Sequence, residues 1–521
     1  MPGGYFQLIA QGPADIYLTG NPSISFFKFV YRRYTPFSME LINLPYTTIP
    51  SFTTTQTTQA HCKVDRNGDL LHDCYLLYDL PAIYTNDIPF SWVDSVGNKL
   101  IDEVSLKCDG QNIDRQFGEF MKVESDLVLT STKKVKYDVL VNGSTNINKI
   151  AYPNVDDVDL LYPALPAKRL LIPLQFWFCK NSGLSIPLIA LQYTEIRMDV
   201  IYTRLNELFK IGTPPISPVQ MFTSDTSELS PENQQFQSIL VSEGWDQTNV
   251  FFRFAKSWDQ YSSVLANYVY LGEDERRKFA QTSHEYLITQ LQRRIYLGLM
   301  RGPSQLDLTL HYPVKEIIWF LRRAEAYKTN DWFNFTDNDC PQLLDKIKNI
   351  RDFLMLPCIS SFTDTQDTQN GIQELKQLSE DFTAQLYDMQ DALFSGEPIS
   401  TINSKKWDYY SIMEQAKLVF NGHDRFEERR NTYFENEQVY RYHTGSGDKG
   451  LYVYSFSLKP EKEQPSGTCN MSRIDTQRLH LNIFNTDVNP QNNDKFDLHF
   501  FAINYNVFRI MGGIGQLVFT N

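Results

Sequence analysis

Short segments in which apolar and polar residues alternate recur along most of the chain. This alternation places every second side chain on one face, which is typical of half-buried β-strands. Turn-forming pairs such as Asn67-Gly68, Asp109-Gly110 and Asn421-Gly422 separate the segments, because asparagine, aspartate and glycine tolerate positive φ. The pattern predicts strands at residues 51–64, 70–80, 104–108, 170–178, 187–200, 264–271, 286–299, 306–320, 417–420, 451–458, 479–484 and 496–510.

Residues 24–34 are dense in aromatic side chains and end in two arginines. One interpretation is a first core strand with a basic, solvated end. The other is an extended arm that docks on a neighbouring molecule, with the arginines facing acidic partners or lipid headgroups. The residues that would make the arm's contacts are Phe26, Phe27, Tyr31, Arg32 and Arg33.

Two long stretches break the strand pattern, at residues 205–260 and 321–410. We interpret the first as a loop rich in polar residues. The second contains an apolar residue at every third or fourth position, which predicts one helical face about six turns long. A helix folded over its own insertion is the favoured interpretation, and a coiled-coil partner is the alternative. The residues of this face are Ile372, Leu375, Leu378, Phe382, Leu386, Met389 and Leu393.

The two halves of the chain contain similar landmarks in the same order. Each half has a strand that ends in an Asn-Gly or Asp-Gly turn, a Ser-Gly pair before a later strand, and an Ala-Asn-Tyr-like motif near its end. This order favours a duplicated β-domain. The matching pairs are 104–111 with 416–423, 182–183 with 466–467, and 266–268 with 502–505.

Eight or so strands per half, joined by long connections, suit a jelly roll better than a meander. The predicted fold is therefore all-β, with two tandem eight-stranded antiparallel jelly rolls and long loop insertions, one of them partly helical. We expect an N-terminal arm at 1–24, a first jelly roll at 25–273 and a second at 281–521. A charged helical connector at 273–279 separates the two jelly rolls.

The composition supports a β-rich globular protein and excludes some functions. Aromatic residues make up 14% of the 521 residues, and aromatic side chains favour strands. The formal net charge of −13 argues against a protein that wraps nucleic acid by neutralising phosphates. The seven cysteines form no Cys-x-x-Cys pair, which suits buried thiols in a reducing compartment. No secretory signal and no membrane-spanning run is expected.

Motifs of enzymes are missing from the sequence: there is no P-loop, no Gly-x-Ser-x-Gly and no EF-hand loop. His61 and His72 flank a predicted hairpin, but two solvent-facing histidines are a simpler interpretation than a metal site. We therefore predict no catalytic, cofactor-binding or metal-binding residue. Three sites match the N-glycosylation pattern and are retained as candidates: Asn142, Asn334 and Asn470.

Several stretches resemble the major capsid proteins of nucleocytoplasmic large DNA viruses. The opening Leu-Thr-Gly-Asn-Pro-Ser-Ile-Ser-Phe-Phe-Lys and the ending, with Gln-Pro-Ser-Gly-Thr-Cys-Asn and Asn-Tyr-Asn-Val, carry the resemblance most clearly. The similar segments cover both halves of the chain. They lie at residues 18–28, 31–33, 66–70, 184–193, 279–280, 284–288, 421–426, 454–460, 464–470, 472–475, 504–507 and 509–511.

The resemblance implies two tandem jelly rolls and a structural role without catalysis or cofactors. It implies a homotrimer that forms a pseudo-hexagonal capsomer, and capsomers that tile an icosahedral shell assembled in the host cytoplasm. Expected partners are other copies of the chain, minor capsid proteins, a penton protein and an inner membrane near the N-terminal arm, with no direct contact to nucleic acid. The insertion at 321–410 has no counterpart in this resemblance, and we expect it to face outward.

A different class of function also fits tandem β-sandwiches. A carbohydrate-binding or glycan-processing protein would present stacked aromatic side chains or a pair of carboxylates in a cleft. The sequence contains many acidic residues but selects no pair among them. We keep this class as the alternative.

Overall fold

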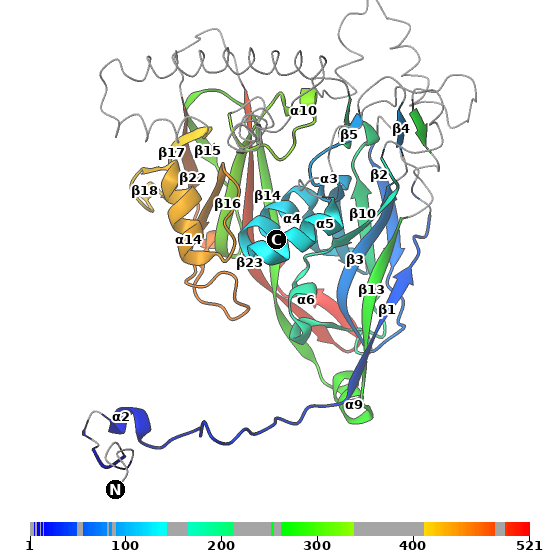
Figure 1. The fold of residues 1–521 in the computed structure, drawn as a ribbon, viewed down its shortest axis with the longest axis vertical. Helices are drawn as coiled ribbons and strands as arrows, with labels where there is room; N and C mark the ends of the chain where they lie inside the picture. Colours follow the sequence, from blue (N-terminus) through cyan, green and yellow to red (C-terminus); the bar gives the residue numbers. More distant parts are fainter. Residues whose placement is uncertain are drawn as a thin grey trace, which may run out of the picture.

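Two β-sandwiches lie side by side in the computed structural model, and the N-terminal segment extends away from them (Figure 1). The structure describes residues 15–48, 56–80, 83–85, 90–142, 165–211, 252–254, 262–337, 411–484 and 495–520, together with isolated positions before residue 15 and at 50. Each sandwich consists of two antiparallel sheets whose principal paths contain four strands each.

The first sandwich consists of sheet 1A, in the order β1-β13-β3-β8, and sheet 1B, in the order β2-β10-β6-β7. A short strand, β9, pairs with β3, and two small sheets, β11-β5 and β12-β4, extend the sandwich. The strands are β1 (Phe37–Leu44), β2 (Thr58–Lys63), β3 (Leu70–Leu80), β4 (Ile83–Thr85), β5 (Phe90–Trp92), β6 (Ile101–Cys108), β7 (Gln111–Phe117), β8 (Lys168–Pro173), β9 (Ile186–Pro187), β10 (Ile196–Tyr202), β11 (Phe209–Ile211), β12 (Phe252–Phe254) and β13 (Ser262–Leu271).

The second sandwich consists of sheet 2A, in the order β14-β23-β16-β20, and sheet 2B, in the order β15-β22-β17-β18. Short strands β21 and β24 join sheet 2A, and β19 joins sheet 2B. The strands are β14 (His284–Leu299), β15 (Gly302–Asp307), β16 (Pro313–Arg323), β17 (Met413–Phe420), β18 (His423–Asp424), β19 (Arg429–Arg430), β20 (Leu451–Ser455), β21 (Cys469–Asn470), β22 (Gln477–Ile483), β23 (Phe496–Met511) and β24 (Ile514–Leu517).

Helices occur mainly in the connections. The helices of the first half are α2 (Ile16–Thr19), α3 (Val96–Leu100), α4 (Gly118–Val128), α5 (Ser131–Val141), α6 (Trp177–Lys180), η1 (Ser182–Leu184) and η2 (Leu205–Glu207). The connector between the sandwiches is α9 (Glu273–Gln281), which confirms the predicted charged helix. The second half has α10 (Ala326–Thr329), the π-helix η4 (Tyr433–Glu437), α14 (Gln438–Tyr442) and η5 (Met471–Arg473).

The two sandwiches share one topology, which confirms the predicted duplication and the fold class. The paired landmarks lie on equivalent elements: β6 with β17, the segments before β9 and β21, and β13 with β23. Even the turns agree, because Asp109-Gly110 has φ of 46° and 83°, and Asn421-Gly422 has 49° and 81°. Two consecutive positive φ values are the geometry of a tight hairpin turn.

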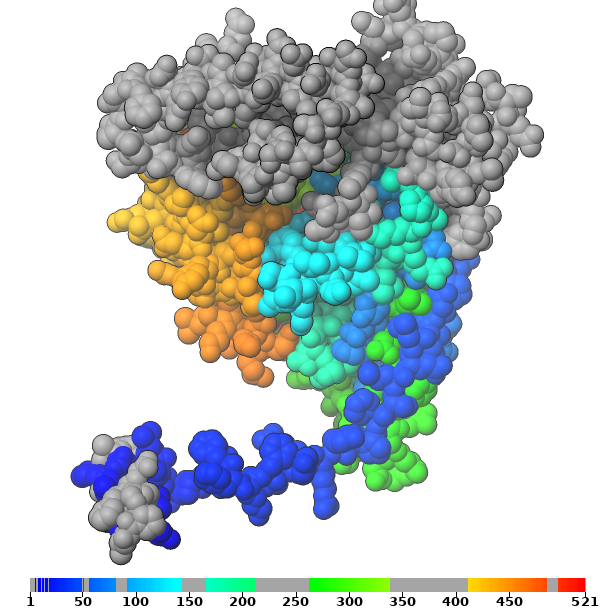
Figure 2. Space-filling model, viewed as in Figure 1, coloured from blue at the N-terminus to red at the C-terminus, as the bar shows by residue number. Residues whose placement is uncertain are grey.

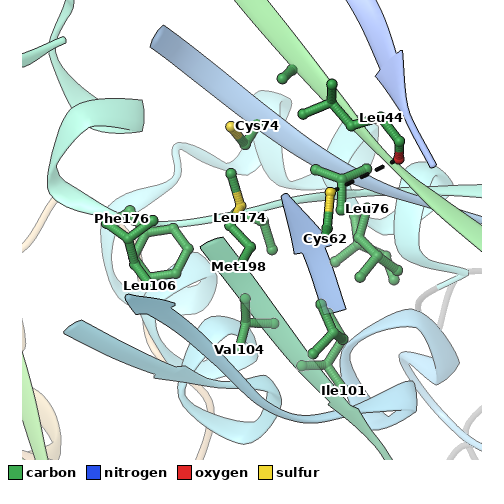
Figure 3. Packing of buried hydrophobic residues seen from close by; sticks show 14 of the residues in the cluster. Leu44, Cys62, Cys74, Leu76, Ile101, Val104, Leu106, Leu174, Phe176 and Met198 are labelled. Carbon is green, nitrogen blue, oxygen red and sulfur yellow. Dashed lines mark hydrogen bonds between the residues drawn. The ribbon is translucent and has the colours of Figure 1, made fainter. Parts of the chain in front are cut away.

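Each sandwich has its own apolar core between its two sheets. Figure 3 shows part of the first core. There Leu76 of sheet 1A belongs to the same buried cluster as three residues of sheet 1B: Cys62, Val104 and Met198. In the second core, the fully buried Trp319 packs against the rings of Phe434, Tyr452 and Phe500. Much of the aromatic content is therefore used for packing within the sandwiches.

Several predicted strands need correction. The interpretation of residues 24–34 as a first core strand is wrong, because this segment is exposed and the first strand begins at Phe37. The predicted strand 170–178 ends at Pro173, which lacks an N–H, and α6 follows it. Residues 187–200 contain the end of β9 and most of β10, and residues 306–320 contain the end of β15 and most of β16. A positive φ of 64° at Tyr312 accompanies the second break.

The two predicted insertions lie only partly within the described residues. Residues 321–323 still belong to β16, so the second insertion begins later than expected. The predicted helical face at 372–393 and most of the stretch 205–260 lie outside the described residues.

Candidate functional site: the seam between the two sandwiches

The described residues contain no group of three or more potential metal ligands. Within the same residues, no helix is long and apolar enough to cross a membrane. His61 and His72 contact different groups: His61 Nδ1 lies 2.7 Å from Asp199 Oδ1, and His72 Nδ1 lies 2.9 Å from the Phe178 carbonyl oxygen. The candidate site is instead the contact between the two sandwiches. We call this contact surface the seam.

The seam is an apolar layer built by α4 of the first half on the outer face of sheet 2A. Phe120, Val123 and Leu127 follow one another at the spacing of one helical face, so α4 presents a continuous apolar stripe. Opposite them, alternate residues of the strands of sheet 2A turn away from their own core and toward α4. These are Ile318, Phe320, Leu451, Val453, Phe501 and Ile503.

An ionic cluster closes one part of the seam. Arg322 of β16 donates to Glu119 of α4 over 2.7 Å and to Nε2 of His499 over 3.0 Å. His499 Nδ1 lies 3.0 Å from the second carboxylate oxygen of Glu119. Burial alone would raise the pKa of Glu119, but His499 and Arg322 outweigh it and hold that pKa well below its usual value. The carboxylate is therefore ionised and paired across the seam.

A second polar contact fastens the other end of α4 to the loop after α14. The ammonium group of Lys122 donates to Asp448 over 2.9 Å. The Gly445 N–H donates to the Leu127 carbonyl over 2.6 Å. A Cβ at residue 445 would lie 2.2 Å from the Asp126 carbonyl oxygen, so only glycine permits this approach.

A groove of about 690 Å³ lies beside the seam, between β7 and β14. Asp114 lines it and accepts hydrogen bonds from Gln116 and from the Leu291 N–H, at 2.9 and 3.3 Å. Burial raises the pKa of Asp114 to about 7 despite these bonds. The hydrogen bonds join the two halves and favour the charged form, so burial is the cause of the raised pKa.

The outer face of sheet 1A is the counterpart of the covered face of sheet 2A, but no helix of the described residues covers it. On β1, Phe37, Met39 and Leu41 are each more than half exposed. They alternate with Leu44 and Ile42, which face the first core. Across the sheet, the same face continues through the half-buried side chains of Leu265, Tyr75, Leu77 and Leu171.

The counterpart of α4 in the second half is the helical segment η4–α14, which also follows the last strand of its sheet. Val439 of this segment packs into the seam, whereas the neighbouring Tyr440 is 89% exposed. The segment lies at the opposite side of the molecule from β1 (Figure 1). The chain thus presents one half of a seam-like contact at each side.

The predicted arm residues lie on the segment that projects from the lower end of the first sandwich (Figure 2). Phe26, Phe27 and Tyr31 are 90%, 100% and 83% exposed. Arg32 and Arg33 are exposed as well. The five residues therefore share one segment, and what they contact stays a prediction.

The three glycosylation candidates differ in accessibility. Asn142 is 1% exposed and accepts a hydrogen bond from Lys168 over 2.8 Å. Asn334 is half-buried, and its side chain bonds to Asp331 and Thr336. Asn470 is exposed, with its oxygen accepting from the Ser472 N–H. Asn470 is thus the candidate that a glycosylating enzyme reaches most directly.

Sequence reasoning missed the seam residues, although one signal was present. The apolar residues of α4 have helical spacing, but the segment is short and follows a strand directly. Glu119, Arg322 and His499 contact one another although they lie 177 or more positions apart in the sequence. No local pattern reports such contacts.

Comparison with known proteins identifies the fold and the family. A family model described as "Large eukaryotic DNA virus major capsid protein" matches residues 275–516, and one described as "Major capsid protein N-terminus" matches residues 25–272. The PBCV-1 virus capsid structure matches with a TM-score of 0.63 at 23% identity, covering 95% of this chain and 100% of that chain. At this identity, the likeness shows the fold.

Two curated relatives match over their whole length. The major capsid protein of Phaeocystis pouchetii virus is 32% identical over 562 residues, and that of Pyramimonas orientalis virus is 31% identical over 548 residues. Both comparisons cover 100% of this chain and 100% of the relative. The chain therefore belongs to the family of major capsid proteins of large eukaryotic DNA viruses, and it is a structural component of a virion capsid.

Proposed function

We propose that three copies of the chain form a closed ring of six sandwiches, and that these pseudo-hexagonal units tile an icosahedral shell. The observation that carries this proposal is the seam within the chain, where α4 packs on sheet 2A. The equivalent of α4 in the second half is η4–α14, and the equivalent of sheet 2A in the first half is sheet 1A. A contact between η4–α14 of one copy and sheet 1A of the next repeats the same pairing. Repetition of one head-to-tail contact closes a ring when the rotation fits.

The chemistry of the two free surfaces supports this pairing. Phe37, Met39 and Leu41 form an exposed apolar stripe on an edge strand, which is unfavourable in water unless a partner covers it. Tyr440 presents a large ring with a polar tip, the kind of side chain that anchors interfaces. Burial of both surfaces in one contact removes the apolar area of each from solvent.

The N-terminal segment extends from the same end of the molecule as α9 (Figure 1). We propose that its exposed aromatic residues and its two arginines face the interior of the shell. There they contact minor capsid proteins, the penton protein or an inner membrane. The net charge of −13 keeps the subunit from binding the enclosed nucleic acid directly.

In this proposal the chain acts through its interfaces, without catalysis, and is synthesised and assembled in the host cytoplasm. The curated relatives are named capsid proteins, which does not favour the carbohydrate-binding alternative. Asn470 is the glycosylation candidate that we retain for modification, because its side chain is exposed.

Size-exclusion chromatography with light scattering tests the proposal on the purified full chain. We expect three times the mass of one chain at micromolar concentration. Tyr440→Asp and Met39→Asp should each shift the mass toward that of one chain, because each places a charge in the apolar contact. Tyr440→Phe is the matched control and should keep the larger mass.

The outcomes separate two parts of the proposal. A wild-type protein with the mass of one chain would overturn the trimer. A wild-type trimer that persists in both aspartate variants would overturn the assigned surfaces but leave the trimer standing. Because Tyr440 and Met39 are both more than half exposed, neither substitution should change the circular dichroism spectrum.

A further inference from the structure

Two cysteines lie beside one another where α6 packs on β3. The Cys74 Sγ lies 4.0 Å and the Cys179 Sγ lies 3.8 Å from the same atom, the carbonyl oxygen of His72. The two sulfur atoms therefore share one backbone contact, which brings them together at this point of the fold. Residues 74 and 179 are far apart in sequence, so only the fold brings their side chains together.

The other described cysteines have different surroundings. The Cys62 Sγ lies 3.9 Å from the carbonyl oxygen of Leu44 (Figure 3) and 3.8 Å from that of Lys63. Cys108 is buried at the end of β6, and Cys469 lies in the second sandwich. Among the residues that the structure describes, Cys74 and Cys179 are thus the best-placed pair.

The two thiols differ in accessibility. Cys74 is 1% exposed, whereas Cys179 is only partly buried. Burial raises the pKa of Cys74 well above its usual value, so its thiolate is rare at neutral pH. Cys179 is therefore the thiol that a small oxidant meets first.

The location gives a bond at this site a structural effect. Trp177 of α6 contacts the ring of Phe508 in β23, with the ring centroids 6.1 Å apart, so α6 links the first sandwich to the second. Phe176 and Phe178 on either side of Trp177 are buried in the first core. A bond between α6 and β3 would hold this linking segment in place.

We propose that Cys74 and Cys179 form a disulfide bond when a small-molecule disulfide, such as oxidised glutathione, reaches Cys179. The Cys179 thiolate attacks the glutathione disulfide, which gives a mixed disulfide and releases one glutathione thiolate. The Cys74 sulfur then attacks the Cys179 sulfur of the mixed disulfide and releases the second glutathione, which takes the Cys74 proton. Two protein thiols are oxidised, and one oxidised glutathione is reduced to two glutathione molecules.

The bond would close a loop of about 100 residues between β3 and α6, and such a loop restrains the unfolded chain strongly. A subunit that folds with free thiols would thereby gain stability once it meets an oxidising environment. This proposal is independent of the trimer, because both cysteines belong to one sandwich of one chain.

Intact mass measurement of the full chain after incubation with oxidised glutathione tests the proposal. We expect a loss of two hydrogen masses under denaturing, non-reducing conditions, and a fall from seven to five in the thiols that can be alkylated. Peptide mapping should identify a link between the peptides of Cys74 and Cys179. The thermal unfolding midpoint of the oxidised protein should rise by several degrees over that of the reduced protein.

Cys179→Ser is the principal variant, because this partly exposed site tolerates the change. Its midpoint should not respond to oxidised glutathione, whereas Cys108→Ala, a cysteine outside the pair, should respond like the wild type. Seven alkylatable thiols after oxidation, a stable glutathione adduct on Cys179, or a link between Cys62 and Cys74 would each overturn the proposal.

Discussion

His443 is a buried histidine held between two carboxylates of the second sandwich. Its Nε2 lies 3.3 Å from Glu316 and its Nδ1 lies 3.4 Å from Glu461, and the side chain is 2% exposed. Burial alone would lower the pKa of His443, but Glu316 and Glu461 outweigh burial and raise it to about 9. The imidazolium is thus the stable form in the folded protein at neutral pH.

This charge makes stability depend on pH in a defined window. Because the folded pKa of about 9 exceeds the unfolded value of 6.5, the stabilisation is complete below pH 6.5 and is lost as the pH rises toward 9. We expect the free energy of unfolding of the wild type to fall by on the order of 2 kcal/mol more than that of His443→Gln between pH 6.5 and 9. Urea unfolding at fixed protein concentration measures this difference.

Other groups do not disturb the comparison. Burial also raises the pKa of Asp114, to about 7, so part of its effect falls in the same window, but Asp114 is present in both proteins. His443→Gln should also be less stable than the wild type at pH 6.5, because it removes the cation that lies between the buried Glu316 and the partly buried Glu461. Parallel pH profiles of the two proteins would contradict this account of His443.

At the scale of elements, α4 supplies the apolar layer by which the first sandwich packs on sheet 2A. Its apolar stripe covers sheet 2A, and its polar residues pair across the seam with Arg322 and Asp448. The ring of Phe120 lies 5.1 Å, centroid to centroid, from Phe501. A helix that is inserted between two strands of one sandwich therefore serves as part of the core of the molecule.

Phe120→Ala should destabilise the protein by about 3 kcal/mol, because it removes a buried ring and leaves a cavity between the halves. Val128→Ala on the same helix is the matched control. Val128 is 37% exposed, so its truncation should cost less than about 1 kcal/mol. Denaturant unfolding monitored by tryptophan fluorescence measures both, and equal effects of the two substitutions would show that the seam does not hold α4 in place.

The regular strands were predictable, but the seam was not. Alternation and turn residues located β3, β13 and β23 closely, because half-buried strands have a local pattern. Residues 24–34 have the composition of a strand, yet they pair with no strand of the described residues. Composition alone therefore does not distinguish a core strand from an exposed arm, because both segments can be rich in aromatic residues.

At the scale of the whole molecule, duplication explains both what the chain buries and what it leaves exposed. Each sandwich carries a helical segment after the last strand of one sheet and an apolar outer face on the other sheet. Within the chain, α4 packs on the outer face of sheet 2A. The corresponding surfaces, η4–α14 and the outer face of sheet 1A, lie at opposite sides of the molecule and present exposed residues (Figure 1). The paired landmarks made the duplication predictable from the sequence. The packing of α4 on sheet 2A was not predictable, because it depends on how the two halves lie against each other.

A high-resolution cryo-electron microscopy reconstruction of virus particles that contain this chain tests the central claim most directly. We predict that density for this chain tiles the shell in units of three, with Tyr440 of one copy against Met39 and Leu41 of the next. A shell in which this chain forms units of another number, or in which these residues face solvent or a different protein, would contradict the account.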